Sequence, residues 1–249
     1  ASNATAAART GCRSVAFTYN DAVIFLEYAV DIATACHERG VRTVAVTAGY
    51  ITDEARPELF GAVDAANVDL KSLDDAFYRN VCAGSLAPVL NTLRYLRHET
   101  PVWLEITTLL IPGLNDSSDE LDALTTWIAE ELGVDAPIHF TAFHPDWKLR
   151  DRPATPAATL SRARDIAVAN GIRYACTGNV HDRAGGSTLC HACGALLIER
   201  DWYELTTWRL RDGLCPECGA ACAGRFVADP GSWGNRRQPV TLGTARLAR

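Results

Sequence analysis

The chain has 249 residues, of which 48% are hydrophobic and 22% charged, and its formal net charge is −6. Such a composition is typical of a globular protein with one main core and room for a small extra module. The acidic balance argues against nucleic acids and anionic membranes as partners. The sequence contains neither an apolar run of bilayer length nor a secretory signal pattern, so a cytoplasmic location is expected.

The first residues, ASNATAAARTG, resemble the end of a helix that stops at a glycine. From Arg13 to Cys176, short β-branched apolar runs then alternate with longer helical patterns. This alternation is typical of βα units around a parallel sheet. The predicted strands cover residues 13–18, 42–47, 63–70, 102–108, 138–143 and 172–177.

Apolar residues three or four positions apart predict helices over residues 25–36, 86–96, 121–132 and 156–171. Gly40 follows the first of these as a stop signal. Ser117 and Glu120 have the spacing of a capping box before the third. Thr155 is expected to be the N-cap of the last helix, with Pro156 at its first helical position.

Polar residues occur where the predicted strands give way to loops. Asp69 and Lys71 are the most informative pair, because side chains two residues apart in a strand point to the same side. The carboxyl ends of parallel strands share one face, where ligands bind in barrel-like α/β folds. We therefore expect a polar pocket there, with a structural salt bridge as the alternative for this pair. The other strand-end residues are Thr18, Thr47, Thr107, Thr108 and His144.

Six ordered motifs resemble one protein family: SVAFTYND, VTAGYIT, ANVDLKSLDDAFYR, TTLLIPGLNDS, FHPDWKLRDRPATP and TGNV. They are similar to the radical S-adenosylmethionine (SAM) enzymes related to pyruvate formate-lyase activating enzyme, specifically the AmmeMemoRadiSam system branch. The resemblance extends from Arg9 to about Arg225. It implies a partial (βα) TIM-like barrel over residues 1–180, in which the strand at 13–18 corresponds to the family's second strand.

The resemblance also implies a set of SAM-binding residues. Asn20 and Asp21 would lie near the methionine amino group, and Thr47 near the ribose. Asp69 and Lys71 would reach the ribose and the methionine carboxylate, which accounts for two opposite charges on one side of a strand end. The adenosine would be bordered by Ile111 and His144.

The sequence departs from the family pattern at three places. The usual TYNEP is TYNDA, and the usual TNG is TAG, so Ala48 replaces a polar side chain. No C-x-x-x-C-x-x-C motif is present, and the cysteines of the predicted barrel lie singly, at positions 12, 36, 82 and 176. A 4Fe-4S cluster needs thiolate ligands. We therefore expect the cluster ligands to lie outside this chain and the chain to be a fragment lacking the first βα unit.

A second module is predicted over residues 185–226, with a mobile tail over 227–249. Two C-x-x-C pairs, each followed by a glycine, flank about twenty residues of strand-like sequence. This pattern indicates a zinc ribbon. Iron in a rubredoxin-like site and a pair of disulfides are the alternatives. The expected ligands are Cys190, Cys193, Cys215 and Cys218.

Other residues of the second module are not expected to act as ligands. Cys222 and His191 lie near the C-x-x-C pairs but are not assigned to the metal. Trp202, Tyr203 and Trp208 are expected to pack against the cysteine pairs or the barrel rather than to bind a base.

Two functions follow from these patterns. The first is a radical SAM enzyme that cleaves SAM reductively to a 5′-deoxyadenosyl radical, abstracts hydrogen from an unknown substrate and depends on an electron donor. The second is a non-catalytic binding or scaffold protein that retains a nucleotide pocket and the metal ribbon. The sequence identifies neither the substrate nor the oligomeric state.

Overall fold

The structure is a computed structural model that describes residues 2–228, 230, 239 and 240. Six strands follow one another in the sheet order β1-β2-β3-β4-β5-β6, and three more form a separate sheet in the order β7-β8-β9. The described residues fall into two compact units. The first unit contains residues 2–69, 88–104, 239 and 240, and the second contains residues 70–87, 105–228 and 230.

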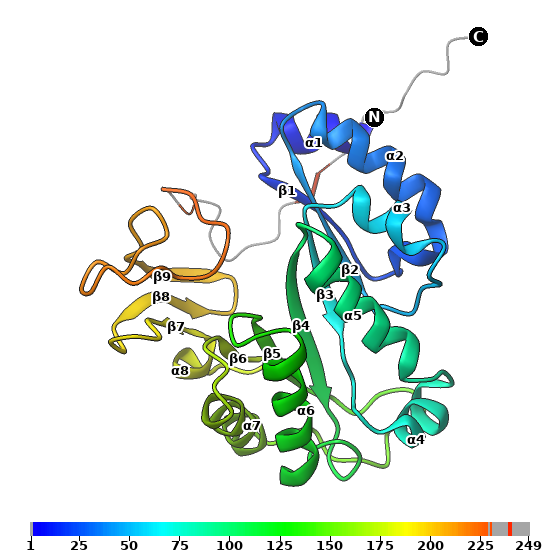
Figure 1. Cartoon of the computed structure of the whole chain (residues 1–249), viewed down its shortest axis with the longest axis vertical. Coiled ribbons are helices and arrows are strands. Elements are labelled where there is room, and N and C mark those ends of the chain that lie inside the picture. The colour runs from blue at the N-terminus through cyan, green and yellow to red at the C-terminus, as the bar shows by residue number, and fades with distance from the viewer. Residues whose placement is uncertain (1, 229, 231–238, 241–249) are drawn as a thin grey trace. The chain divides into compact units, whose positions relative to one another are not determined.

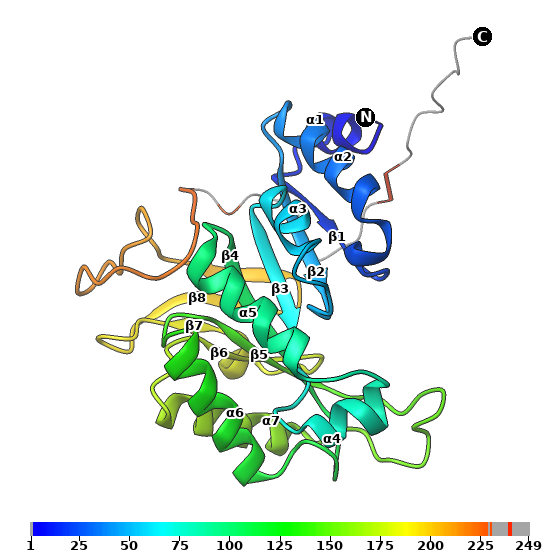
Figure 2. The ribbon, with the colours of Figure 1, turned by 45° about the vertical axis from the view of Figure 1, so that its right-hand side comes forward.

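The first unit begins with α1 (Ser2–Arg9), β1 (Ser14–Phe17), η1 (Ala22–Phe25) and α2 (Leu26–His37). It continues with β2 (Arg42–Thr47), α3 (Arg56–Gly61), β3 (Ala65–Asp69) and α5 (Ala87–Glu99). β2 pairs in parallel with both β1 and β3. Helices α1 and α2 lie side by side in Figures 1 and 2. Ile32, Ala45, Leu59, Val68 and Leu93 are among its buried core residues.

The second unit contains α4 (Asp75–Phe77), η2 (Tyr78–Cys82), most of β4 (Trp103–Leu110) and α6 (Ser118–Glu131). It continues with β5 (Ile138–Ala142), α7 (Ala157–Ala169), β6 (Ala175–Gly178) and α8 (Arg183–Gly186). β5 pairs in parallel with β4 and with β6. Helix α6 lies beside α7, which packs on β5 and β6 (Figure 2). The antiparallel strands β7 (Thr188–Leu189), β8 (Leu196–Asp201) and β9 (Glu204–Trp208) follow.

The two faces of β4 differ in burial, and this difference decides which side chains can meet a ligand. Leu104, Ile106, Thr108 and Leu110 are buried, whereas the residues between them are only half-buried. β5 and β6 show a similar alternation. In each strand, one set of side chains therefore belongs to the core and the other set stays accessible.

The predicted strands and helices are present in the predicted order, and an α/β fold with a parallel six-stranded sheet is confirmed. The curvature of a partial barrel stays a prediction. The sequence patterns missed η1, α3, α4, η2 and α8. The predicted tail at 227–249 lies almost entirely outside the described residues. Within the part of the chain that is described, every helix is too short or too polar to span a membrane.

Two predicted helix caps are only partly correct. The hydroxyl of Ser117 accepts from the backbone N–H of Glu120, as expected, but the Glu120 carboxylate accepts from Ser72 instead of closing a capping box. Thr155 is not the N-cap of α7, because Pro156 occupies that position without a side-chain cap. The Thr155 hydroxyl instead donates to Leu110 O at 2.6 Å. Tertiary hydrogen bonds have replaced local ones in both cases.

Candidate functional site

In the first unit, Asp21 joins the ends of β1 and β2. Its Oδ1 accepts from the Thr47 hydroxyl at 2.8 Å and from Val23 N at 3.2 Å. Its Oδ2 accepts from Ala48 N at 2.8 Å. The structure therefore brings Asp21 and Thr47 together, and their contacts with a ligand stay a prediction. Because three donors already surround the carboxylate, Asp21 holds the loop that follows β1.

The TAG segment after β2 is tightly fixed. Thr47 is buried and its hydroxyl accepts from Gly49 N at 3.0 Å, while Gly49 O accepts from the Thr92 hydroxyl at 2.8 Å. These hydrogen bonds fix the backbone on both sides of Ala48. By contrast, Asn20 is exposed, and its neighbour Tyr19 is 90% exposed with a φ of 70°. Asn20 is therefore accessible to a ligand.

Asp69 and Lys71 fall on either side of the boundary between the units. Asp69 is the last residue of β3 and of the first unit, and its side chain is half-buried. Lys71 belongs to the second unit and is half-buried as well, between the buried Leu70 and Ser72. The burial pattern fits the alternation that the sequence predicted for this strand end.

The Lys71 backbone is held by side chains of the second unit. Lys71 N donates to the Tyr78 hydroxyl at 3.1 Å, and Lys71 O accepts from Asn115 Nδ2 at 2.7 Å. Asn115 Oδ1 also accepts from Ile111 N at 2.7 Å. Two predicted cofactor contacts, Lys71 and Ile111, therefore share one amide. Sequence reasoning missed Asn115, although the residue lies within the TTLLIPGLNDS motif, because its role depends on Lys71 O, 44 positions earlier.

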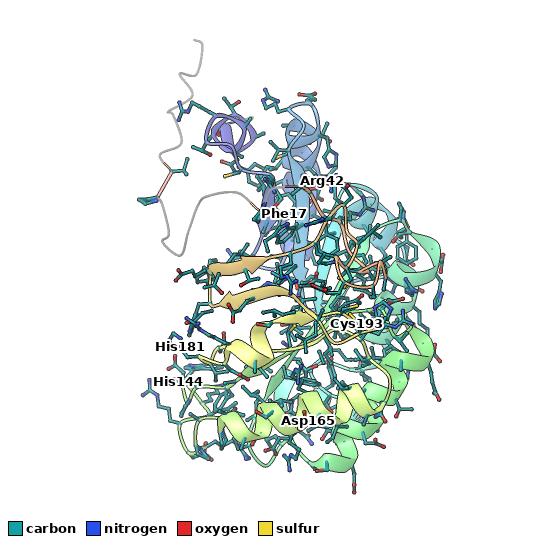
Figure 3. All side chains as sticks on the ribbon, turned by 90° about the vertical axis from the view of Figure 1, so that its left-hand side faces the viewer. Phe17, Arg42, His144, Asp165, His181 and Cys193 are labelled. Atoms are coloured by element: carbon teal, nitrogen blue, oxygen red, sulfur yellow. The ribbon has the colours of Figure 1, made fainter. Side chains whose placement is uncertain are left out.

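His144 follows β5 and is exposed, so its side chain is accessible where the strand ends. Figure 3 shows His144 and His181 at the same edge of the second unit. The loops after β5 and β6 are joined by Asn179, whose Nδ2 donates to Ala142 O at 3.3 Å. The expectation that Thr107 and Thr108 lie at a strand end is wrong, because β4 continues to Leu110.

A polar pair on the half-buried face of β4 and β5 was also missed. His139 Nε2 lies 2.8 Å from Glu105 Oε2. His139 is paired in register with Thr107 on β4 and with Cys176 on β6. Parallel strands that are covered on both faces are normally apolar throughout. The polar residues Glu105 and His139 inside two otherwise apolar strands were therefore a signal for this pair.

The four cysteines of the two C-x-x-C pairs come together in the second unit. Their sulfur atoms all lie within 4.8 Å of one another. Cys190 Sγ is 3.6 Å from Cys218 Sγ, and Cys193 Sγ is 3.7 Å from Cys215 Sγ. Tetrahedral zinc with sulfur at about 2.3 Å requires separations of roughly 3.8 Å. The four thiols therefore fit a metal ion of this size.

The backbone around these cysteines is shaped for thiolates. Burial favours a high pKa for Cys190, but the N–H groups of Cys193 and Ala192 lower its pKa to about 7. The Ala195 N–H also lowers the pKa of Cys193. The neighbouring thiols, of which Cys218 has the largest effect, outweigh it and raise the pKa of Cys193 to about 12. Repulsion between neighbouring thiolates disfavours their ionisation when no cation is bound. A bound metal ion would allow all four thiols to ionise.

The small antiparallel sheet has its own core. It contains Cys190, Cys215, Leu197, Ile198 and Leu210, together with Tyr174 and Cys222. Trp208 packs against this core, as predicted, and its ring contacts that of Phe226. The prediction is wrong for Trp202 and Tyr203, which are 50% and 64% exposed at the turn between β8 and β9. Trp202 contacts His181 instead, with ring centroids 5.2 Å apart.

The remaining cysteines do not fit a 4Fe-4S cluster. Among the described residues, the four cysteines above are the one group of three or more Cys, His, Asp or Glu side chains arranged to bind a metal. Cys36 is buried within α2, and Cys176 lies in β6. Cys12 lies between α1 and β1, Cys82 is the last residue of η2, and both are half-buried. No step of cluster chemistry can therefore be assigned to them.

Comparison with known proteins relates the chain to radical SAM activating enzymes. It is 41% identical over 215 residues to the uncharacterized protein MJ0808 of Methanocaldococcus jannaschii, covering 86% of this chain and 63% of that protein. It is 29% identical over 131 residues to benzylsuccinate synthase activating enzyme of Thauera aromatica, covering 52% of this chain and 39% of that enzyme. The identity is 25% over 127 residues to pyruvate formate-lyase 1-activating enzyme of Escherichia coli K12, covering 50% of each. The chain thus spans less than two thirds of each of these relatives.

Solved structures share the fold. A domain of pyruvate-formate lyase-activating enzyme from Bacteroides vulgatus aligns with a TM-score of 0.58 at 20% identity, covering 66% of this chain and 98% of that domain. A radical SAM methyltransferase from Sphaerobacter thermophilus aligns with a TM-score of 0.57 at 18% identity, covering 78% of this chain and 58% of that enzyme. No family model matches the chain.

Proposed function

We propose that the chain is the SAM-binding part of a radical SAM enzyme. The observation that carries this proposal is the position of the motif residues. Asn20, Thr47, Asp69 and His144 each lie at or just beyond the carboxyl end of a strand in a chain related to radical SAM activating enzymes. In parallel α/β folds these ends bind ligands. The chemistry would be reductive SAM cleavage followed by hydrogen abstraction from a substrate.

The residue roles in this proposal are those implied by the motif resemblance. Asp69 accepts from the ribose hydroxyls, Lys71 neutralises the methionine carboxylate and His144 borders the adenosine. Asn20 and Asp21 lie near the methionine amino group and Thr47 lies near the ribose. The hydrogen bond between Asp21 and Thr47 also holds the two loops together. Ile111 contributes an apolar contact to the adenosine. The assignment to the AmmeMemoRadiSam branch belongs to this proposal and rests on the six motifs.

The iron–sulfur cluster, when bound, would supply the electron that cleaves SAM. We propose that its ligands lie outside this sequence, which contains no C-x-x-x-C-x-x-C motif. An external electron donor and a cytoplasmic location are part of the same proposal. The names of the relatives describe activation of other enzymes, so a polypeptide is the first substrate class to test.

The four-cysteine group is proposed to be a structural zinc ribbon. Four protein thiolates leave no open coordination position for a substrate or water. Sulfur separations of 3.6 Å and 3.7 Å support a tetrahedral ion. Iron in the same four-sulfur geometry is the competing occupant.

Calorimetric titration of the purified chain with SAM, together with metal and sulfide analysis, tests the proposal. We expect about one zinc per chain, no acid-labile sulfide and weak SAM binding that Asp69→Ala abolishes. Asp31→Ala is the matched control, because Asp31 is exposed on α2. Unchanged SAM binding in Asp69→Ala would contradict the proposed site. A chain that binds metal but no SAM would favour a scaffold protein, and a stoichiometric four-iron cluster would overturn the assignment of its ligands.

A further inference from the structure

Three consecutive residues after β3 are each bound by a side chain from residues 108–120, which run from β4 into α6. Leu70 O accepts from the Thr108 hydroxyl at 2.7 Å, and Lys71 O accepts from Asn115 Nδ2 at 2.7 Å. The Ser72 hydroxyl donates to the Glu120 carboxylate. The backbone carbonyls of Leu70 and Lys71 are thus both held, and the side chain of Ser72 anchors the next residue. These contacts restrict the direction in which the Lys71 side chain leaves the backbone.

Among these contacts, Asn115 alone uses both ends of its side chain. Nδ2 donates to Lys71 O at 2.7 Å and to Leu109 O at 2.9 Å, while Oδ1 accepts from Ile111 N at 2.7 Å. The residue is 2% exposed, so water does not compete for these groups. A carboxylate in the same place keeps the acceptor but loses both donors. The amide therefore links the backbones of Lys71 and Ile111. Asparagine suits this position because one side chain supplies both the donors and the acceptor.

We propose that Asn115 is a positioning residue for SAM: its amide holds the Lys71 backbone so that the ammonium group meets the methionine carboxylate, and it fixes Ile111 beside the adenosine. This inference rests on the proposed function, which assigns both contacts. Asn115 itself does not touch the ligand. Its contribution is the lower freedom of Lys71 before binding, and such preorganisation raises affinity.

Asn115→Asp distinguishes the contact with Lys71 from the contact with Ile111. The substitution keeps the acceptor for Ile111 N and removes the donor to Lys71 O. We expect it to weaken SAM binding about tenfold while changing the affinity for 5′-methylthioadenosine, which lacks the methionine carboxylate, less than about twofold. The measurement is calorimetric titration of both ligands with the full chain. A general loss of structure would weaken both ligands, so the ratio of the two effects is the informative quantity.

Asn170→Asp is the matched control. The Asn170 amide also joins two elements, donating to Asp122 O at 3.2 Å and to the Thr125 hydroxyl at 2.8 Å. It takes no part in the contacts assigned to SAM, so its replacement is expected to leave the ratio of the two affinities unchanged. Tyr78→Phe tests the same backbone from its other side by removing the acceptor for Lys71 N. It is expected to lower SAM affinity selectively, by about threefold.

Coupling to Lys71 gives a second criterion. Lys71→Ala is expected to lose SAM affinity, and adding Asn115→Asp is expected to cause little further loss, because the two changes remove one contact. Equal weakening of both ligands by Asn115→Asp, no weakening, or fully additive losses would each overturn the inference. A wild-type chain that binds neither ligand would overturn the proposed function, and the inference with it. Selective loss with non-additivity supports both.

Discussion

The cysteine turns of the small sheet and the loops at the strand ends are both held in fixed conformations, but by contacts of different sequence range. Each cysteine turn is closed locally: Cys190 N donates to Ala195 O and Cys215 N to Ala220 O, both at 2.8 Å. The strand-end loops are held by side chains from distant segments, such as Thr47 on Asp21, 26 positions apart, and Asn115 on Lys71, 44 apart. The first arrangement can therefore be encoded by a short motif, whereas the second requires the folded sheet.

The glycines show the same contrast. Gly194 and Gly219 adopt φ values of 73° and 75°, and an added Cβ would meet nothing within 4 Å at either position. Gly49 has a similar φ of 67°, but an added Cβ would lie 2.8 Å from Val68 Cγ1. The cysteine turns need glycine for its backbone alone, while the loop after β2 also needs its small size.

Removal of the metal is expected to have the largest effect and tests whether the local contacts suffice. Because the small sheet has a core of few residues, Cys215→Ser should abolish metal binding and unfold β7, β8 and β9. Structural zinc contributes on the order of 10 kcal/mol in small zinc domains. Hydrogen exchange should rise over residues 188–208 while β2 stays protected.

His191→Ala is the control for this prediction, since His191 is exposed between two ligands and is expected to leave the metal bound. Retained protection of β8 in metal-free protein would show that backbone and core contacts stabilise the small sheet without an ion. The cysteine turns and the strand-end loops would then differ only in how far apart in the sequence their hydrogen-bonded residues are.

Replacement of Gly49 is expected to have the next largest effect. Gly40→Ala provides the comparison, because Gly40 has the same φ of 67° and open space around it. Both substitutions incur the left-handed backbone cost of about 1–2 kcal/mol. Gly49→Ala should lose about 1–3 kcal/mol more, from overpacking against Val68. Urea unfolding of both variants measures the difference, and equal destabilisation would mean that the loop shifts to make room.

The sequence was sufficient for features that depend on local pattern. The C-x-x-C spacing predicted the four clustered cysteines, because each such turn brings its two sulfur atoms close together. Hydrophobic periodicity predicted the strands and helices in their observed order. The limits of the elements were less accurate: β4 extends to Leu110, past the predicted end at Thr108.

Features that depend on contacts across the fold could not be read from the sequence. Thr155 and Glu120 both occupy positions typical of helix caps, yet their side chains bond to Leu110 O and to Ser72. Asn115 lies in a motif that was recognised, but its role follows from the nearness of Lys71 O, 44 positions earlier. Trp202 and Tyr203 were expected to pack against the cysteine pairs or the barrel, but the turn between β8 and β9 leaves both side chains at least half exposed.

The smallest expected effect concerns the Asp64 carboxylate, which links distant segments of the first unit. The Asp64 carboxylate accepts from Thr43 N at 2.8 Å and lies 2.9 Å from His37 Nε2. Burial alone would raise the pKa of Asp64. The hydrogen bond from Thr43 N–H and the contact with His37 together lower this pKa by more, so it lies below the ordinary value for aspartate. A lowered folded-state pKa gives stability that is present above the unfolded pKa, about 4, and is lost as the pH falls through the folded value.

Asp64→Asn is therefore expected to destabilise the chain by about 1 kcal/mol at pH 7, and by progressively less as the pH falls below about 4. Asp31→Asn, on the exposed face of α2, should leave stability within about 0.5 kcal/mol at every pH. Urea unfolding at pH 7, 5 and 3.5 checks both. If the difference between Asp64→Asn and wild type stays constant over this range, the hydrogen-bonded shape of the side chain, and not its charge, holds β2 and β3 at this end.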